Sequence, residues 1–231
     1  MALFAMADLH LSLGIKDKPM DVFGAGWQDY MEKINKKCRL VLTDDDVLLV
    51  PGDISWATYM EQATEDFNFI EALPGKKIIS KGNHDYWWDT ISKLNKFKTE
   101  KEYKTIEFLH NNFFVYENVA VCGNRGWMYS ASQEDIKIYD RELSRLELSL
   151  AAAHEAGFDK KIVMTHFPPT VALEAGDDRM IKLMKQYGVT ECIYGHLHNI
   201  NPKENHTQTV CGIKLRLVAA DYLEFNPVRI L

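Results

Sequence analysis

The chain has 231 residues, of which 46% are hydrophobic and 26% charged, enough for a sizeable buried core in one globular domain over residues 1–231. This composition excludes intrinsic disorder and collagen-like repeats. The 33 acidic residues outnumber the 27 Lys and Arg residues, and the net charge of -6 argues against a broad surface for duplex nucleic acid. A small acidic substrate would therefore need cations placed locally.

The cysteines and the first residues of the chain indicate the cellular compartment in which the protein is expected to work. The 4 cysteines show no Cys-x-x-Cys spacing and are typical of reduced thiols rather than of a disulfide framework. Residues 1–8 lack the basic segment of a secretion signal, and no apolar run approaches the roughly 18 residues that a membrane span needs. We therefore expect an unprocessed cytoplasmic protein that does not enter a membrane.

Short apolar runs rich in Val, Ile, Leu and Phe recur along the chain, each bounded by Gly, Pro, Asn or Asp. They predict buried strands at 3–7, 47–50, 77–80, 113–116, 119–122, 162–165, 192–194 and 215–219. Apolar residues three or four apart predict helices around 27–38, 60–70, 87–97, 133–156 and 178–187. The alternation of strands and helices predicts an α/β fold.

Turn and cap signals refine this pattern. Ser132 is expected to cap the longest helix, and Gly157 is expected to end it. A turn at Asn118 between two predicted strands, and the stretch 207–218, indicate hairpins. The sheets are therefore expected to be mixed rather than purely parallel.

Polar side chains follow the ends of several predicted strands. The candidate metal ligands among them are Asp8, His10, Asp53, Asn83, His166, His196 and His198. Because ligands bind beyond the carboxyl ends of strands in α/β sheets, residues far apart in the chain can converge there. The set exceeds what one tetrahedral site needs, whereas two ions that share a carboxylate would use all of it. We expect Asp53 to be the shared ligand.

The spacing within the motifs suggests how the donors point. Gly52, Gly82 and Gly195 are expected to let the chain turn sharply where each strand becomes a loop. In Asp8-x-His10 and in His196-x-His198, side chains two apart would lie on one face of an extended segment. Both members of each pair could then reach the same cavity.

Each motif alone also has a purely structural interpretation. Asp8-x-His10 could be a turn at a strand end, Asp53 could cap a helix at 56–57, and His166 could be a packed loop histidine. Gly-Asn-His-Asp at 82–85 is more specific, because a given tetrapeptide rarely arises by chance. All the motifs in one order, each at a strand end, favour a metal site.

The motif series Asp-x-His, Gly-Asp, Gly-Asn-His-Asp, His, Gly-His-x-His resembles the calcineurin-like metallophosphoesterase superfamily. The resemblance implies a four-layer α/β/β/α sandwich of two mixed sheets flanked by helices, with a dinuclear metal site at the strand ends. It implies one metal ion held by Asp8, His10, Asp53 and His198, and a second held by Asp53, Asn83, His166 and His196.

One departure from the family pattern narrows the expected activity. Protein Ser/Thr phosphatases of the superfamily continue Gly-Asp with Asp-Arg, whereas this chain continues with Ile54-Ser55-Trp56-Ala57. The departure argues against protein phosphatase activity. The sequence is closer in character to a small bacterial-type phosphohydrolase.

The expected reaction is hydrolysis of a phosphomonoester or phosphodiester by a hydroxide shared between two divalent ions, Mn²⁺ being favoured over Fe²⁺, Zn²⁺, Co²⁺ or Ni²⁺. Asp53 and His84 are the expected catalytic residues. His84 cannot point the same way as its neighbour Asn83, so it can face the substrate and protonate the leaving group. Asp85 either orients His84 or caps a helix near Tyr86.

Substrate binding is assigned to Asn83, His84 and Arg125, whose guanidinium could hold two phosphate oxygens or form a surface ion pair. Aromatic residues near the motifs could wall a pocket or belong to the core; they are Trp56, Tyr86, Trp87, Trp88 and 127–129. Two other functions stay open: a metal-stabilised module that binds a phosphorylated ligand without cleaving it, and a nuclease that takes a short single strand.

Overall fold

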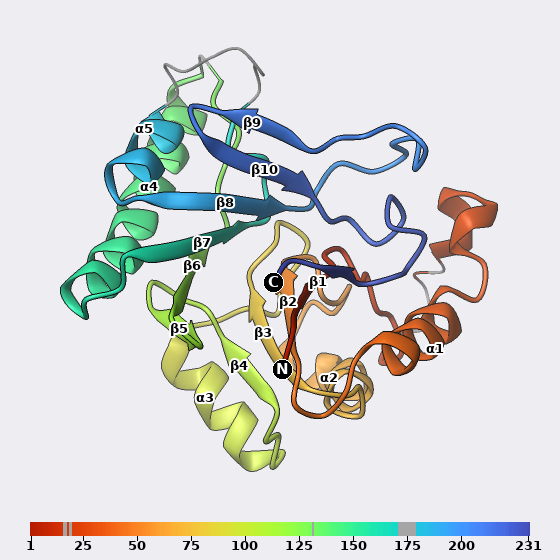
Figure 1. Cartoon of the computed structure of the whole chain (residues 1–231). Coiled ribbons are helices and arrows are strands. Elements are labelled where there is room, and N and C mark those ends of the chain that lie inside the picture. Colours follow the sequence, from red (N-terminus) through yellow and green to blue (C-terminus); the bar gives the residue numbers. More distant parts are fainter. Residues whose placement is uncertain (16–17, 19, 131, 171–178) are drawn as a thin grey trace.

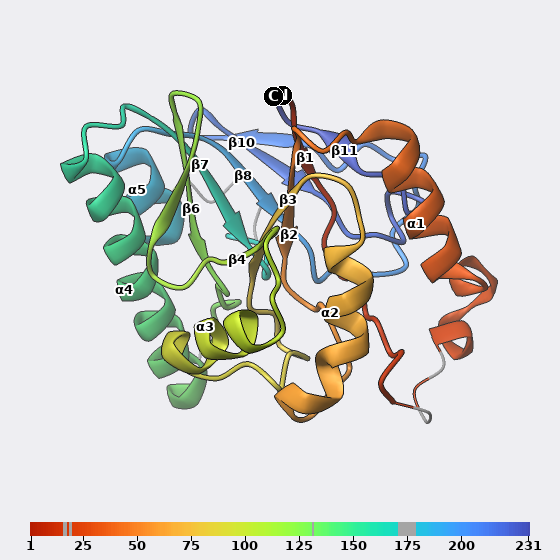
Figure 2. The same ribbon diagram turned by 90° about the horizontal axis from the view of Figure 1, so that it is seen from below.

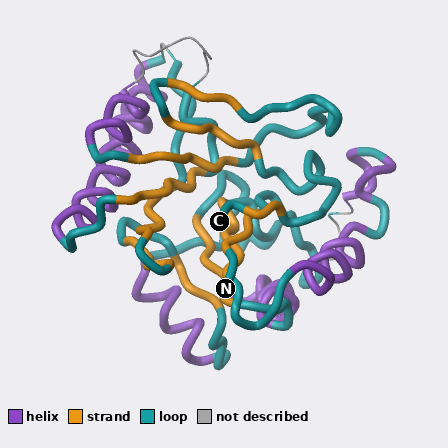
Figure 3. Tube along the Cα trace, in the orientation of Figure 1, coloured by secondary structure: helices purple, strands orange, loops and turns teal. Residues whose placement is uncertain are grey.

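The structure is a computed structural model that describes residues 1–15, 18, 20–130, 132–170 and 179–231. Two sheets pack face to face and helices cover their outer sides, as Figures 1 and 2 show from two directions. Figure 3 shows the strands at the centre and the helices at the periphery. The predicted four-layer α/β/β/α sandwich of two mixed sheets is confirmed. Within the described ranges, no helix is both long and apolar enough to cross a bilayer.

The first sheet has the strand order β11-β1-β2-β3-β4. Its strands are β1 (Leu3–Ala5), β2 (Val47–Pro51), β3 (Lys76–Ser80), β4 (Ile106–Phe108) and β11 (Val228–Arg229). β1 to β4 run parallel and β11 pairs antiparallel with β1. The outer face packs on helices α1 (Tyr30–Val41), α2 (Thr64–Glu71) and α3 (Ile91–Glu100). Short 3-10 helices lie at Met20–Phe23 (η1), Ala25–Trp27 (η2) and Met60–Ala63 (η3).

The second sheet has the order β5-β6-β7-β8-β10-β9. Its strands are β5 (Phe113–Tyr116), β6 (Val119–Asn124), β7 (Lys160–Thr165), β8 (Val189–Tyr194), β9 (Gln208–Val210) and β10 (Ile213–Leu217). Helices α4 (Gln133–Glu155) and α5 (Arg179–Gln186) cover its outer face. The β5–β6 and β9–β10 pairs are antiparallel, which confirms both predicted hairpins.

A shared apolar layer joins the two sheets. Leu49 and Ile78 of the first sheet lie in one buried cluster with Val121, Ile162 and Ile193 of the second. Their strands are buried on both faces because helices cover the opposite sides, which explains why the strands read as continuous apolar runs. Burial of this layer fixes how the two sheets face each other.

Some predicted element bounds shift. The predicted helix at 87–97 begins only at Ile91, because Trp87 and Trp88 are buried in the core beneath it. β4 and β11 were not predicted, since both are short edge strands with polar residues among the apolar ones. The predicted cap is confirmed: the Ser132 hydroxyl accepts a hydrogen bond from the Asp135 N–H at 3.1 Å. Asp178, the first residue of the last predicted helix, lies outside the described residues.

The ends of the two sheets meet at one edge of the sandwich. Ala7, just after β1, forms an isolated bridge with Ala219, just after β10. The Asp8 N–H donates to the Gly52 carbonyl, and the Gly195 N–H donates to the His166 carbonyl. Loops that follow β1, β2, β7 and β8 are thereby tied together, which is the convergence that the polar motifs require.

Candidate metal centre

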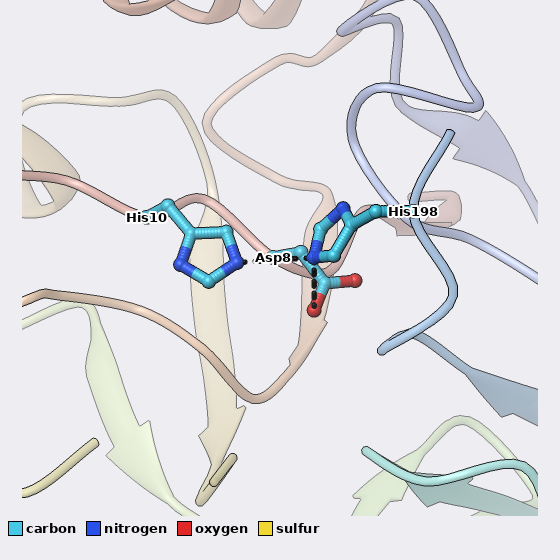
Figure 4. Close-up of side chains that lie close together, drawn as sticks. All are labelled: Asp8, His10 and His198. Carbon is cyan, nitrogen blue, oxygen red and sulfur yellow. Dashed lines mark hydrogen bonds and ion pairs between the residues drawn. The ribbon is translucent and has the colours of Figure 1, made fainter. Parts of the chain in front are cut away.

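Asp8, His10 and His198 form one group of potential ligands (Figure 4). His10 Nε2 lies 3.1 Å from His198 Nε2, and His198 Nε2 lies 3.9 Å from Asp8 Oδ1. One donor atom from each residue lies within 4.8 Å of the other two. These residues come from loops after β1 and β8, so the group spans both sheets.

A second group lies beside the first. His166 Nε2 is 2.6 Å and His196 Nδ1 is 3.0 Å from the same atom, Asn83 Oδ1. Asp53 and His166 also form a compact group with Asp8. All the residues predicted as metal ligands therefore meet in one region, although His10 and His198, for example, are 188 positions apart in the chain.

Asp53 lies between the two groups. Its Oδ2 is 3.7 Å from His10 Nε2 and 3.4 Å from His166 Nε2, and this buried oxygen has no hydrogen-bond partner. Its other oxygen accepts the His84 N–H at 2.8 Å. Both oxygens of Asp8, by contrast, lie 3.1 Å from the His196 N–H. The free lone pairs of Asp53 Oδ2 thus face imidazoles from both groups.

The carboxylates of the site are buried without a cationic side chain. Asp8 and Asp53 are 0% and 1% exposed, and the described part of the chain places no Lys or Arg in an ion pair with either. Burial, together with the charges of Asp85 and Asp8, raises the pKa of Asp53 to about 9. Burial likewise raises the pKa of Asp8 to about 7. A bound cation would offset this cost, so the donors fit divalent ions.

The histidines are set to act as ligands. Burial lowers the pKa values of His10 and His166 well below the ordinary value and that of His196 to about 4, which keeps these imidazoles neutral. His166 Nδ1 lies 3.2 Å from the Pro51 carbonyl, the acceptor for its proton. Its Nε2 lone pair is then left facing Asn83 and Asp53. Neutral imidazole with a fixed tautomer is the form that binds metal.

The backbone at the site is held in an unusual conformation. Asp8, His10, Asp53 and His196 all have positive φ, at 58°, 45°, 51° and 69°. The prediction that Asp8-x-His10 and His196-x-His198 lie on extended segments is therefore wrong, although both pairs reach the site. Left-handed non-glycine residues cost of order 1–3 kcal/mol each and cluster at functional sites. The strain turns each side chain inward at a tight bend.

At two of the three glycines, the lack of a side chain allows close packing against a neighbouring residue rather than a sharp turn of the backbone. Gly52 does need its freedom, with φ of 85°. Gly82 and Gly195 do not have left-handed φ; instead, a Cβ at Gly82 would lie 2.1 Å from Asp53 Oδ1, and one at Gly195 would lie 2.3 Å from Asp8 Oδ2. Any side chain at either position would displace a candidate ligand.

Asp85 organises the loops of the site rather than capping a helix. Its carboxylate accepts N–H groups from Gly82 at 2.7 Å, Ile54 at 2.8 Å and Ser55 at 3.2 Å, and the Trp87 indole N–H at 3.1 Å. The next helix begins at Ile91, so the predicted cap near Tyr86 is wrong. Asp85 instead ties the loop that carries Asp53 to the loop that carries Asn83.

Asp221 is a member of the site that the sequence motifs missed. Its Oδ1 lies 3.1 Å from His198 Nδ1, and its Oδ2 accepts the Asn199 N–H at 3.0 Å. Burial alone would lower the pKa of His198, but the hydrogen bond to Asp221 and the charge of Asp8 raise it. Asp221 follows β10 as the other polar residues follow their strands, and that placement was the available signal.

The remaining predicted residues lie around the site. His84 is half-buried, burial lowers its pKa, and its ring lies 4.5 Å from that of Trp56. The Arg125 guanidinium lies 3.3 Å from Glu142 Oε1 and 4.7 Å from the Trp127 ring, so it engages a carboxylate of its own chain. Trp56 lines a pocket beside the candidate metal ligands. Of the two predicted alternatives for the aromatic residues, pocket wall or core, this residue fits the first.

Fold and site together define a two-sheet α/β protein with a buried cluster of potential metal ligands. The calcineurin-like phosphoesterase family model matches residues 1–199. The chain therefore belongs to the calcineurin-like phosphoesterases and is a metal-dependent phosphoesterase, as its motifs predicted. Membership implies divalent metal ions, and the ligand groups above are present for them.

Solved structures share this fold at low sequence identity. A phosphopantetheinyl hydrolase from Mycobacterium tuberculosis is 15% identical with a TM-score of 0.57, over 100% of this chain and 95% of that one. TT1561 of Thermus thermophilus is 12% identical with a TM-score of 0.57, over 99% and 97%. AQ665 of Aquifex aeolicus, a protein of unknown function, is 15% identical with a TM-score of 0.53, over 99% and 95%. No curated protein sequence matches the chain.

Proposed function

We propose that the protein hydrolyses a small phosphomonoester or phosphodiester with two divalent ions, Mn²⁺ foremost. One observation carries this proposal: Asp53 Oδ2 is buried and unpartnered between His10 Nε2 and His166 Nε2, at 3.7 and 3.4 Å. A single carboxylate oxygen in that position suits a ligand shared between two ions. Bound divalent ions would neutralise phosphate charge and lower the pKa of water at the site.

The ligand assignment follows from the two groups. Asp8, His10, Asp53 and His198 would hold one ion, and Asp53, Asn83, His166 and His196 would hold the other. Asp221 fixes the tautomer of His198 by accepting its Nδ1 proton, which leaves Nε2 to bind. Asp85 holds the loops of Asp53 and Asn83 at a fixed separation, because its carboxylate accepts hydrogen bonds from the N–H groups of Ile54 and Gly82.

His84 is proposed to protonate the leaving oxygen. Its backbone N–H is bound to Asp53, while its half-buried ring faces the pocket that His10 and His198 also line. His84 Nδ1 has no hydrogen-bond partner, so the ring is not committed to its own turn. Burial lowers the pKa of His84, and the negative charge of a bound phosphoryl group would oppose that shift.

Asn83 and Arg125 complete the proposed substrate contacts. Asn83 lies within the ligand cluster and would hold the substrate only through its amide nitrogen. Arg125 would have to leave Glu142 to reach a phosphate oxygen, because its guanidinium lies 3.3 Å from that carboxylate. Of the two, Asn83 is therefore the better-placed contact.

The protein is also proposed to work in the cytoplasm. All four cysteines are free in the structure, and three of them are buried; they are Cys38, Cys122, Cys192 and Cys211. Free thiols suit a reducing compartment. We further propose that residues 1–231 act as one domain, since the layer between the sheets draws on both halves of the chain.

The test is a metal-dependent assay with p-nitrophenyl phosphate and bis-p-nitrophenyl phosphate in the presence of Mn²⁺. We expect turnover that chelation abolishes and Mn²⁺ restores. His84→Ala should reduce kcat by about 100-fold or more, the usual contribution of a general acid, while the Mn²⁺ content stays unchanged. Purified protein that binds Mn²⁺ but cleaves neither ester would contradict the proposal.

A further inference from the structure

An apolar pocket opens directly onto the candidate metal centre. The pocket has a volume of about 280 Å³, and its lining residues are His10, Met20, Phe23, Trp27, Trp56, His84, His198 and Asn199. We call it the aromatic pocket. Three of its lining residues belong to the site already described, and the other five play no part in metal binding.

The walls of the aromatic pocket are mostly rings, and one described cation stands near them: Lys18 Nζ lies 5.3 Å from the centre of the Trp56 ring. The Trp56 ring stacks on the His10 ring, with centroids 4.9 Å apart and an interplanar angle of 22°. The Trp56 indole N–H donates to Sδ of Met20, another lining residue, 3.0 Å away, so this polar group already has a partner. The described lining residues include no carboxylate, ammonium or guanidinium group. Such walls favour an apolar planar group over a sugar.

The pocket lies where a leaving group would be. His84, the proposed proton donor, lies beside both Trp56 and the candidate ligand His10, with its ring centroid 4.5 Å from that of Trp56 and 5.7 Å from that of His10. A proton donor must lie beside the oxygen that departs. The group attached to that oxygen would therefore extend along Trp56 into the aromatic pocket.

An exposed apolar side chain stands at the mouth of the pocket. Phe23, in η1, is 56% exposed and also lines a second hollow of about 600 Å³ that Lys33, Lys37 and Glu224 border. A planar ring in the aromatic pocket would lie against this exposed phenyl group and beside the buried Trp27.

We infer that the substrate is a phosphoester whose leaving alcohol carries an aromatic ring, and that Phe23, Trp27 and Trp56 bind this ring. The inference rests on the proposed phosphoesterase function and names its substrate class.

The test compares 2-phenylethyl phosphate with ethyl phosphate in the presence of Mn²⁺. Both esters release a primary alkoxide, so the ring is the main difference between them. We expect kcat/KM to favour the phenylethyl ester by about tenfold or more, as burial and stacking of one ring would give. Phe23→Ala should bring the ratio to within about threefold, since one pocket wall is lost.

Val22→Ala is the matched control. Val22 neighbours Phe23, is 72% exposed and does not line the aromatic pocket, so this variant should keep the wild-type ratio. Thermal melts should show both variants folded, because both side chains are exposed. A wild-type ratio near one, or a Phe23→Ala ratio equal to that of the wild type, would overturn the inference while leaving the phosphoesterase proposal standing.

A binding measurement tests the aromatic pocket independently of catalysis. The non-hydrolysable 2-phenylethylphosphonate and ethylphosphonate are titrated into the Mn²⁺-loaded protein by calorimetry. Tighter binding of the phenylethyl compound, reduced by Phe23→Ala, supports the pocket even if neither ester is hydrolysed; in that case only the phosphoesterase proposal fails. Equal affinities for the two phosphonates would overturn the pocket whatever the activity.

Discussion

Two buried carboxylates of the molecule, Glu142 and Asp53, have opposite electrostatic surroundings. Glu142 of α4 is 0% exposed and lies 2.9 Å from Arg145, 3.3 Å from Arg125 and 3.6 Å from Arg141. Asp53 is 1% exposed, and within the described residues its ion-pair contacts are with histidines alone. The first carboxylate is neutralised by the chain itself, whereas the second is not.

This contrast indicates that the Glu142 cluster stabilises the fold and that the Asp8 and Asp53 cluster binds cations. A buried charge without a partner is costly, and removal of one member of a buried pair is strongly destabilising. Glu142 and its arginines form a complete unit that fixes α4 against the end of β6. Asp53 and Asp8 form an incomplete unit, with imidazoles but no Lys or Arg in ion pairs among the described residues, that divalent cations would complete.

The largest expected effect comes from Asp53→Asn. The variant should lose more than about 100-fold in kcat/KM, since changes that only support a metal ligand already cost 10–100-fold. Its metal-free form should be no less stable than the metal-free wild type, because the amide removes a buried carboxyl that no Lys or Arg neutralises. Initial rates and thermal melts in chelator check the two parts.

Asp45→Asn is the control for this variant, since Asp45 is exposed in the turn before β2. It should change neither activity nor melting temperature. An Asp53→Asn protein that is several degrees less stable than the wild type without metal would show that the site is complete without cations. The contrast with Glu142 would then be lost.

Glu142→Gln should give the opposite pattern. The three arginines lose their carboxylate, and we expect a loss of about 3 kcal/mol, at the low end for a broken buried pair because Arg141 and Arg145 are partly exposed. For a chain of this size that corresponds to a fall of roughly 6–12 °C in Tm. The number of Mn²⁺ ions bound should not change. Glu147→Gln, an exposed position on the same helix, should leave Tm in place.

Asp221→Asn tests the support of a single ligand. The amide keeps the size of the side chain but loses the negative charge beside His198 Nδ1, 3.1 Å away. We expect Mn²⁺ affinity to fall by about 10–100-fold, with activity largely recovered at saturating metal. Mn²⁺ titration of the rate measures this shift. An unchanged metal dependence would remove Asp221 from the site.

The smallest expected effect is a pH dependence of the metal-free protein. The pKa values of Asp8 and Asp53, about 7 and about 9, are raised above the ordinary value, so the folded state holds protons that the unfolded state releases. Stability should therefore fall as pH rises through about 7 and about 9.

Melts of metal-free protein from pH 6 to pH 9 measure this slope, with Asp53→Asn as the comparison. The variant should show a shallower fall than the wild type. Mn²⁺ must displace these protons, so its affinity should rise with pH over the same range. Equal slopes for the variant and the wild type would contradict the raised pKa of Asp53.

The sequence predicted which residues meet but not how the backbone brings them together. Apolar runs predicted most of the strands, and the polar residues after them predicted which side chains meet, because both depend on local pattern. The left-handed conformation of Asp8 and His10 and the close contact of Gly82 with Asp53 depend on neighbours far away in the chain. Pattern alone cannot encode such contacts.

Asp85 and Asp221 are two further residues whose roles depend on contacts that the sequence pattern does not predict. Asp85 was identified but given a local role, whereas its partners lie about thirty positions away, at Ile54 and Ser55, as well as nearby. Asp221 was not identified, because it lies 23 positions beyond His198 and forms no motif with it. In both cases the role comes from tertiary contacts between loops.

The most direct test is the electron paramagnetic resonance spectrum of the protein loaded with Mn²⁺. Two ions that share Asp53 should give an exchange-coupled signal once two equivalents are bound. A spectrum of isolated Mn²⁺ only, at saturating metal and in active protein, would contradict a shared carboxylate between the two ligand groups.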